Sequence, residues 1–203
     1  IDIEGMSMLA RVVDRVRRAR TVDRVIVATT TQTQDDLLAA HARDLGVDVY
    51  RGDEDDVLDR YYQAALQHHL DIVVRITSDC PLLDPGVLDD AVRPLLVAGS
   101  RVEYSSTGLH RTFPRGMDVE VVPFLTLAQV WRDAKAVHER AHVFPYIYQH
   151  PERFTTFKVV DDVDRSHMRW TVDTPEDLAF VRQVYRELGT PAFSWRDVLT
   201  ILE

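Results

Sequence analysis

Two segments far apart in this 203-residue sequence repeat one pattern: a short apolar run, an aspartate, and a helix-capping residue followed by proline. Residues 72–85 hold the first copy, with Asp79 after the apolar run, and residues 168–177 hold the second, with Asp173. Proline suits the first position of a helix because an N–H would have no partner there. We therefore predict two strands that each end near a carboxylate and pass into a helix. Such strand exits line the ligand crevice of open α/β sheets.

The rest of the chain alternates between helical and strand patterns. This alternation predicts one α/β domain over residues 1–203, with helices in layers on both faces of a mostly parallel sheet. We expect residues 108–122 to project as an arm, and residues 118–122 to be a half-buried strand because polar and apolar side chains alternate there. Further strands are expected at residues 22–29, 47–51, 154–160 and 169–172, and helices at residues 35–45, 87–96, 125–134, 137–149, 176–188 and 195–202.

The net charge and the cysteine content limit the binding partners and the cellular location that we expect. The formal net charge of −9 opposes sequence-independent binding to nucleic acid or to an anionic membrane, so we expect neither as a partner. A phosphorylated ligand would need a divalent cation, helix N-termini or a local arginine cluster. The chain has one cysteine and no apolar run of membrane-spanning length, and we expect a cytoplasmic protein.

Five motifs occur in one order along the chain. They are residues 52–60 (G-D-E-D-D-V-L-D-R), 74–82 (V-R-I-T-S-D-C-P-L), 116–121 (G-M-D-V-E-V), 139–143 (E-R-A-H-V) and 169–178 (R-W-T-V-D-T-P-E-D-L). Together they resemble the cytidylyltransferase family that includes spore-coat polysaccharide biosynthesis protein F. That family is related to the synthetases of CMP-sialic acid and CMP-3-deoxy-manno-octulosonate. The resemblance runs from about residue 5 to residue 188.

The resemblance implies a three-layer, Rossmann-like fold of the nucleotide-diphosphosugar-transferase type. It also implies a magnesium-dependent reaction of CTP with an acidic sugar or similar acceptor, with release of pyrophosphate. At matching positions it implies that Asp79 and Asp173 bind Mg²⁺ and are catalytic, and that Arg140 and His142 contact the acceptor. Mg²⁺ is commonly held by one or two carboxylates plus substrate phosphates, which is the ligand set that these two acids would complete.

Residues at the ends of strands are further candidates for contacts with the nucleotide and the acceptor. We predict that four residues at successive strand ends ring the cytidine and its phosphates: Thr29, Thr30, Gly52 and Arg75. Glu120 faces the same side of its strand as Asp118. Either acid could touch acceptor hydroxyls or pair with Arg111 or Arg115.

Several candidates also have a purely structural interpretation. Asp79 could be a turn aspartate that binds its own backbone. For Arg75 an internal ion pair is as good an explanation as a ligand contact, because an unpaired charge within an apolar strand is costly. We assign Asp177 to a capping box with Thr174. Cys80 is expected to be a small buried thiol rather than a nucleophile.

Two features depart from the family pattern. The family begins with a strand and a glycine-rich, basic loop that cradles the triphosphate, and no such loop occurs here. We expect the natural chain to be longer, because loss of a central strand would expose the sheet. Residues 5–7 also stand where the family has Gly-Lys-Pro, and Ala141 stands where it often has an acid.

Related enzymes pair through an arm of this kind, so we expect a homodimer. Its buried apolar patch is predicted to consist of Val119, Val121, Val122 and Phe124.

Two other functions stay open at this point. Metal-dependent nucleotide-sugar glycosyltransferases usually carry Asp-x-Asp at the equivalent strand exit, and this sequence reads Asp79-Cys80-Pro81 instead. A non-catalytic nucleotide-binding domain has only the missing loop in its favour. The acceptor depends on loops that vary on a shared scaffold.

Overall fold

The computed structural model describes residues 1–97 and 99–202 and confirms the α/β class of the fold. The strands are β1 (Asp2–Ile3), β2 (Met6–Ser7), β3 (Ile26–Thr30), β4 (Asp48–Gly52), β5 (Ile72–Arg75), β6 (Tyr104–Ser106), β7 (Glu120–Pro123) and β8 (Thr156–Lys158). The helices are α1 (Met8–Arg17), the 3₁₀ helix η1 (Thr33–Asp35), α2 (Asp36–Asp44), α3 (Val57–Gln67), α4 (Pro85–Leu96), α5 (Phe124–Asp133), α6 (Val137–His142), α7 (Pro145–Gln149), α8 (Pro175–Leu188) and α9 (Trp195–Leu202).

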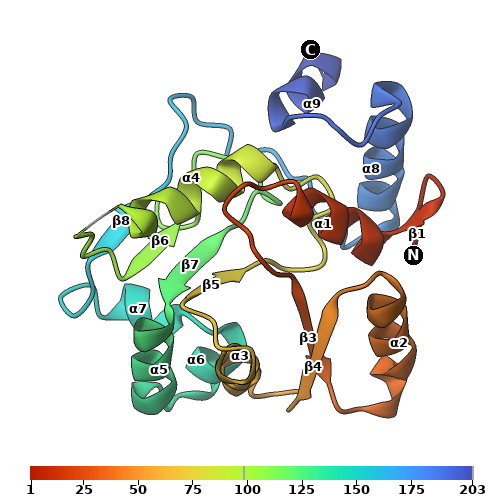
Figure 1. Ribbon diagram of the computed structural model, residues 1–203. Coiled ribbons are helices and arrows are strands. Elements are labelled where there is room, and N and C mark those ends of the chain that lie inside the picture. Colours follow the sequence, from red (N-terminus) through yellow and green to blue (C-terminus); the bar gives the residue numbers. More distant parts are fainter. Residues whose placement is uncertain (98, 203) are drawn as a thin grey trace.

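Strands β3 to β8 form a middle layer between two layers of helices, while β1 and β2 form a separate hairpin beside α8 (Figure 1). Helices α1, α4, α8 and α9 lie on one side, and α3, α5, α6 and α7 lie on the other. No helix in residues 1–97 and 99–202 is long and apolar enough to cross a membrane.

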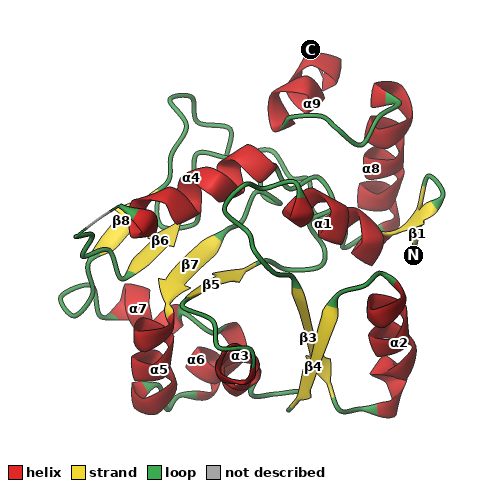
Figure 2. Ribbon diagram, in the orientation of Figure 1, coloured by secondary structure: helices red, strands yellow, loops and turns green. Residues whose placement is uncertain are grey.

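The sheet is mixed rather than mostly parallel. Strands β3 and β4 pair in parallel, while a four-stranded sheet has the order β5-β7-β6-β8, in which β7 runs antiparallel to both of its neighbours. The reason is the connection into β7. Residues 107–119 between β6 and β7 contain no helix (Figure 2), and a parallel pairing needs a long crossover, usually a helix.

A cleft separates the two groups of strands. Within the described chain, β3 pairs only with β4 and β5 pairs only with β7, so each has one unpaired edge. Both strands line a cleft of about 1310 Å³ that α1 and α3 also border. Apolar side chains contribute much of its wall, including Val12 and Val16 of α1 and Ala64 and Ala65 of α3.

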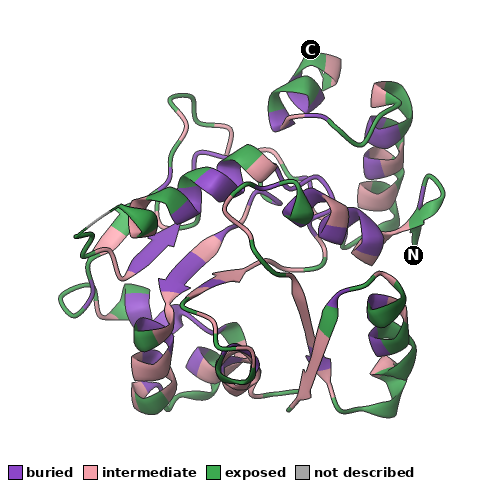
Figure 3. Ribbon diagram, viewed as in Figure 1, coloured by how far each residue is buried: buried purple, intermediate pink, exposed green. Residues whose placement is uncertain are grey.

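The core has one part on each face of the four-stranded sheet. Val121 packs with apolar residues of α1, α4, α8 and α9, while Val122 and Val73 pack with those of α3, α5 and α7. Successive residues of a strand point to opposite faces of the sheet, so Val121 and Val122 pack against different helices. Figure 3 shows this burial along β6 and β7.

The core contains residues that were expected in a projecting arm, so that expectation is wrong. Val119, Val121 and Val122 are fully buried inside the protein, so they do not form the predicted dimer patch, and Phe124 packs beside the second part of the core. The alternating pattern of residues 118–122 belongs to a central strand. Its polar positions are paired inside the domain, as described below.

Two other segments differ from expectation. Residues 137–149 form α6 and α7 rather than one helix, since Pro145 starts α7 and Val143 between them has a φ of 75°. Phe144 N–H donates to the His142 carbonyl at 3.0 Å, which closes a γ-turn around Val143. A β-branched residue rarely adopts a positive φ, so this corner is strained. Residues 169–172 form only an isolated bridge, between Arg115 and Arg169.

Candidate active site

Asp79 and Asp173 belong to segments that touch. The backbone N–H of Val172 donates to the carbonyl of Asp79 at 2.9 Å, so Asp173 directly follows a residue bonded to Asp79. This hydrogen bond joins two residues that are 93 positions apart in the sequence. The two acids that the repeated pattern singled out therefore lie in adjoining segments, Asp79 in the loop after β5 and Asp173 just ahead of α8.

Helix caps fix the position of each exit. The Asp84 side chain accepts from the N–H groups of Gly86 and Val87 at 2.7 and 3.1 Å, which starts α4 after the turn that holds Asp79. Thr174 and Asp177 form the predicted capping box of α8, directly after Asp173. These caps confirm the structural role assigned to Asp177.

The two carboxylates have different surroundings. The Asp79 carboxylate has no cationic partner among the described residues; its one side-chain contact is the Cys80 thiol, which donates to Oδ1 at 3.6 Å. Oδ2 of Asp173 accepts from Arg169 Nη2 at 2.5 Å and from Thr171 Oγ1 at 2.9 Å. Carboxylate oxygens are hard ligands of the kind that Mg²⁺ prefers, and the predicted sharing of one ion by Asp79 and Asp173 stays a prediction.

Arg169 and Thr171 were missed by the sequence reasoning. They precede Asp173 by four and two positions, so in an extended segment all three side chains point to the same side. That two-residue spacing is the signal that could have found them. Arg169 Nη2 also donates to Asp177 at 3.2 Å, so one guanidinium joins the strand exit to the first turn of α8.

Cys80 is the buried thiol that the sequence predicted. Its side chain is only 1% exposed, and burial followed by the nearby Asp79 charge raises the pKa of the thiol well above its usual range. A thiol that stays protonated is a poor nucleophile. Cys80 therefore does not compete with Asp79 as a candidate for the chemistry of this turn.

The loop before β7 packs against the Asp173 segment. Arg115 pairs with Arg169 through an isolated parallel bridge, and Trp170 N–H donates to the Arg115 carbonyl at 2.7 Å. Asp118 accepts from Arg111 Nη2 at 2.5 Å and from the Gly116 N–H at 2.9 Å, so the alternative pairing with Arg111 is the observed one.

The predicted nucleotide residues fall on both sides of the cleft. Thr29 and Thr30 of β3 line one side and Arg75 of β5 lines the other, while Gly52 at the end of β4 does not line the cleft. Both threonine hydroxyls donate to Asp35 Oδ2, at 2.7 and 2.5 Å. These hydrogen bonds lower the pKa of Asp35, so its carboxylate stays charged at neutral pH.

Gly52 has less open space than expected. A Cβ added there would meet ring and stem atoms of Tyr50 and Arg60 at 3.1 and 3.2 Å. Protein side chains therefore fill the space next to this glycine. Its predicted contact with the nucleotide stays a prediction.

Arg75 and Glu120 pair with each other. Arg75 Nη1 donates to Glu120 Oε2 at 2.5 Å, and the two residues stand opposite each other in the register of β5 and β7. Burial lowers the pKa of Arg75, but the charge and hydrogen bond of Glu120 together with the nearby Tyr61 and Tyr104 outweigh it, so the pKa is raised. The structural interpretation of Arg75 is thus observed, and it joins the candidate nucleotide residue to a candidate acceptor residue.

Arg140 and His142 do not converge. Arg140 donates to the Asp56 carboxylate through Nε at 2.9 Å and Nη2 at 2.6 Å, and to the Trp131 carbonyl through Nη1 at 2.7 Å. Asp56 is the N-cap of α3, so this pair fastens α6 to the start of α3. His142 is exposed. The acceptor contacts of both residues stay predictions.

This geometry predicts that Arg140→Ala lowers the free energy of unfolding by about 1–3 kcal/mol, because charge-assisted hydrogen bonds of a partly exposed pair are lost. Chemical denaturation is the measurement. The control is Arg132→Ala, since Arg132 is largely exposed and pairs only with its neighbour Asp133. Equal effects of the two substitutions would contradict the anchoring role.

Comparison with known proteins identifies the family of the chain. The layered α/β fold is that of a solved cytidylyltransferase and of a solved CMP-sugar synthetase. The family model described as cytidylyltransferase matches residues 1–193, so the chain belongs to the cytidylyltransferase family.

Similar proteins carry names of the same kind. The spore coat polysaccharide biosynthesis protein SpsF of Bacillus subtilis is 30% identical over 96% of this chain and 82% of its own length. A solved cytidylyltransferase of Leptospira borgpetersenii has a TM-score of 0.95 at 31% identity and covers all of this chain and 85% of its own. CMP:2-keto-3-deoxy-manno-octonic acid synthetase, solved with CTP, shares the fold with a TM-score of 0.65 at 15% identity, over 93% of this chain and 91% of its own.

Proposed function

We propose that this protein transfers CMP from CTP to an acidic sugar or a similar acceptor and releases pyrophosphate. The reaction would serve the biosynthesis of a cell-surface polysaccharide or glycoconjugate. One observation supports the proposal above the others: the 2.9 Å hydrogen bond that brings the Asp173 segment onto Asp79, in a chain of the cytidylyltransferase family. We further propose a cytoplasmic enzyme that works as a homodimer through a surface other than the buried Val119 to Val122 strand.

The chemistry makes one bond and breaks one. An acceptor oxygen attacks the α-phosphorus of CTP, the bond from that phosphorus to the bridging oxygen of pyrophosphate breaks, and the acceptor hydroxyl loses its proton. Negative charge builds on the leaving pyrophosphate. A Mg²⁺ ion held by Asp79 and Asp173 would supply charge neutralisation there.

The protein's own residues position the reactants. Arg169 holds the carboxylates of Asp173 and Asp177 in place, and because these two acids outweigh its charge, a bound cation would have to supply positive charge for the phosphates. The Thr29 and Thr30 end of β3 borders the cleft on the side proposed for the nucleotide. In this acidic chain, such local positive charge is needed for a triphosphate to bind.

A direct assay separates this function from its alternatives. The full-length protein is incubated with Mg²⁺ and each nucleoside triphosphate in turn, with and without a panel of sugar acids, and pyrophosphate is measured. We expect release with CTP that requires one of the sugar acids. Transfer from a nucleotide sugar with no pyrophosphate would indicate a glycosyltransferase, and nucleotide binding without any turnover would indicate a binding domain.

A further inference from the structure

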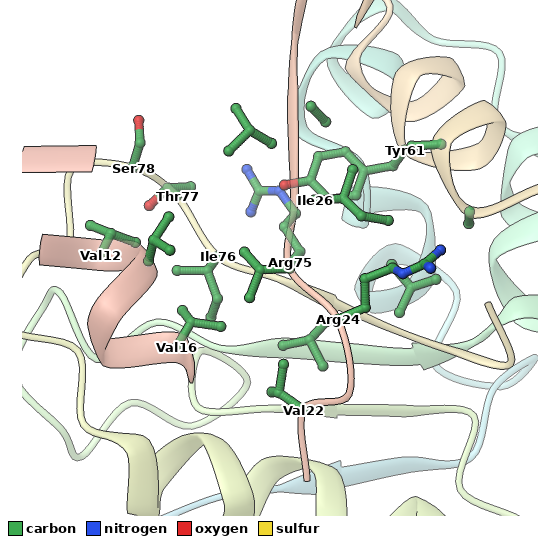
Figure 4. Close-up of a pocket in the computed structure, with 18 of the residues that line it drawn as sticks. Val12, Val16, Val22, Arg24, Ile26, Tyr61, Arg75, Ile76, Thr77 and Ser78 are labelled. Carbon is green, nitrogen blue, oxygen red and sulfur yellow. The ribbon is translucent and has the colours of Figure 1, made fainter. Parts of the chain in front are cut away.

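The turn between β5 and α4 carries Asp79 on a segment whose shape depends on other parts of the chain. Residues 76–84 contain no strand or helix, so their backbone groups need partners elsewhere. Thr77 and Ser78 line the cleft (Figure 4), whereas residues 80–84 are buried. The carbonyls of residues 79, 81 and 83 each accept a hydrogen bond from a distant residue. The first is the bond from Val172 described above, and the other two come from buried side chains.

Tyr185 of α8 holds the middle of the turn. Its hydroxyl donates to the Pro81 carbonyl at 2.7 Å. Tyr185 is only 5% exposed, and its ring contacts the Arg11 guanidinium and the ring of Phe193. Burial raises the pKa of Tyr185 to about 12, so the hydroxyl keeps the proton that it donates. Because α8 begins directly after Asp173, one helix is attached to both of the segments that carry the acids.

Arg15 of α1 holds the end of the turn. Its Nε donates to the Leu83 carbonyl and its Nη1 to the Phe193 carbonyl, each at 2.7 Å. The residue is 1% exposed, and Nη2 lies 4.0 Å from Oδ2 of Asp84. The same Asp84 oxygen accepts from the N–H of Trp195 at 2.7 Å. One buried guanidinium therefore joins the turn to α1 and to the start of α9.

These contacts lie apart from the cleft. Among the described residues that line the cleft, neither Arg15 nor Tyr185 is found, and neither are the two residues whose carbonyls they bind. The Asp79 carboxylate itself has the Cys80 thiol as its one side-chain contact in the described chain, at 3.6 Å. The backbone of the turn, rather than a strong side-chain partner, thus sets where this carboxylate lies.

We propose that Tyr185 and Arg15 are positioning residues for Asp79: they fix the backbone of the turn, and the turn fixes the carboxylate. A group that must bind a ligand in one geometry is held by contacts of this kind behind it. The alternative is that both residues only stabilise the core. The inference rests on the proposed function for the role of Asp79, but it can be tested without turnover.

Cys80 reports on the turn because it follows Asp79 and is the one cysteine of these 203 residues. Its thiol is 1% exposed, so iodoacetamide can reach it only when the turn opens. The rate of labelling at Cys80 is followed by mass spectrometry on the full-length protein, at one fixed pH and well below the thermal midpoint. The affinity for Mn²⁺ with saturating CTP is measured on the same samples by electron paramagnetic resonance.

Tyr185→Phe removes one hydroxyl and keeps the ring. We expect Cys80 to be labelled about 5-fold faster, because the turn loses one hydrogen bond, and Mn²⁺ to bind about 3-fold more weakly. The matched control is Tyr146→Phe, since Tyr146 is also buried, in the core on the other face of the sheet, where its hydroxyl contacts Arg153. The control should lose similar stability but show wild-type labelling and Mn²⁺ affinity.

Arg15→Lys tests the second residue. Lysine keeps the charge but lacks the planar fork that binds two carbonyls, so we expect labelling of Cys80 about 5-fold faster than in wild type. The control is Arg182→Lys, because Arg182 of α8 donates through Nε and Nη2 to the Asp2 carbonyl and not to the turn. It should be labelled like wild type. If Arg15→Lys does not fold, Tyr185→Phe decides the question alone.

Three results would overturn the proposal: unchanged labelling in Tyr185→Phe, faster labelling with an unchanged Mn²⁺ affinity, or the same changes in Tyr146→Phe. A wild-type complex that binds no Mn²⁺ would also overturn it, since Asp79 would then have no ligand to be positioned for. If labelling and Mn²⁺ affinity change as expected but the wild-type protein releases no pyrophosphate, the positioning role stands and the proposed function fails.

Discussion

Asp79→Asn and Asp173→Asn are each expected to lower turnover by about 10²–10⁴-fold, with little change in the thermal midpoint. The reason is electrostatic, since asparagine keeps the shape of the side chain but removes the charge that a cation at the strand exits requires. Folding should change little because Asp79 has no cationic partner among the described residues and Asp173 is exposed. Pyrophosphate release and thermal unfolding are measured on the full-length protein.

Asp177→Asn is the control for this prediction. Asp177 is four residues from Asp173 and accepts from the backbone N–H groups of Asp173 and Thr174, which lower the pKa of its carboxyl. A lowered pKa means that this carboxylate stabilises the fold above the pH range of a free aspartate and loses that effect as the pH falls through its folded pKa. The variant should be active but less stable at neutral pH. Equal inactivity of all three variants would remove the distinction between ligand and cap.

Gly116→Ala is expected to lower the free energy of unfolding by about 2–4 kcal/mol, the largest stability effect predicted for a single methyl group in this chain. Gly116 has a φ of 102°, and an added Cβ would lie 2.9 Å from the backbone carbon of Trp170. Backbone cannot give way as a flexible side chain can, so the loop before β7 would move off the Asp173 segment. Activity should fall together with stability.

The control for this substitution is Gly189→Ala. Gly189 ends α8 with a φ of 62°, and an added Cβ would meet nothing within 4 Å. That variant should show only the cost of a left-handed conformation, about 1 kcal/mol. Chemical denaturation of both variants gives the comparison, and similar losses would show that contact with Trp170 is not what requires glycine at position 116.

Signals that act within a few residues were read correctly from the sequence. The start of α4 at Asp84-Pro85 and the capping box of α8 at Thr174 depend only on bonds inside one turn, so the local residues specify them. The segments of Asp79 and Asp173 do touch, while the sharing of one ion by their carboxylates stays a prediction. The buried, unreactive Cys80 followed from its setting in an apolar turn.

Features that depend on distant partners were not predictable in the same way. Asp118 and Glu120 gave the segment before β7 the polar appearance of a surface arm, but Arg111 and Arg75 neutralise them inside the domain. The segment could then become the central strand of the sheet, with its partners 7 and 45 positions away in sequence. The pairing with Arg111 was one of the alternatives open from the sequence, whereas no local pattern encodes the pairing of Glu120 with Arg75.

The break between α6 and α7 shows a related limit. The periodic pattern of residues 137–149 is continuous, and only Pro145 hints at an end. Val143 accepts an unfavourable backbone conformation because its side chain is fully buried against the core on that face of the sheet. Tertiary packing therefore overrides the local preference of a β-branched residue.

The claim that Asp79 and Asp173 share one cation with the nucleotide is tested most directly by electron paramagnetic resonance with Mn²⁺, which favours the same oxygen ligands as Mg²⁺. Free Mn²⁺ is titrated with the full-length protein in the presence of saturating CTP and no acceptor, and free CTP at the same concentration is the blank. We predict one tightly bound ion in the wild-type complex, an affinity about 10-fold or more weaker in Asp79→Asn and in Asp173→Asn, and a wild-type affinity in Asp177→Asn. An unchanged Mn²⁺ affinity in both of the first two variants would contradict the account.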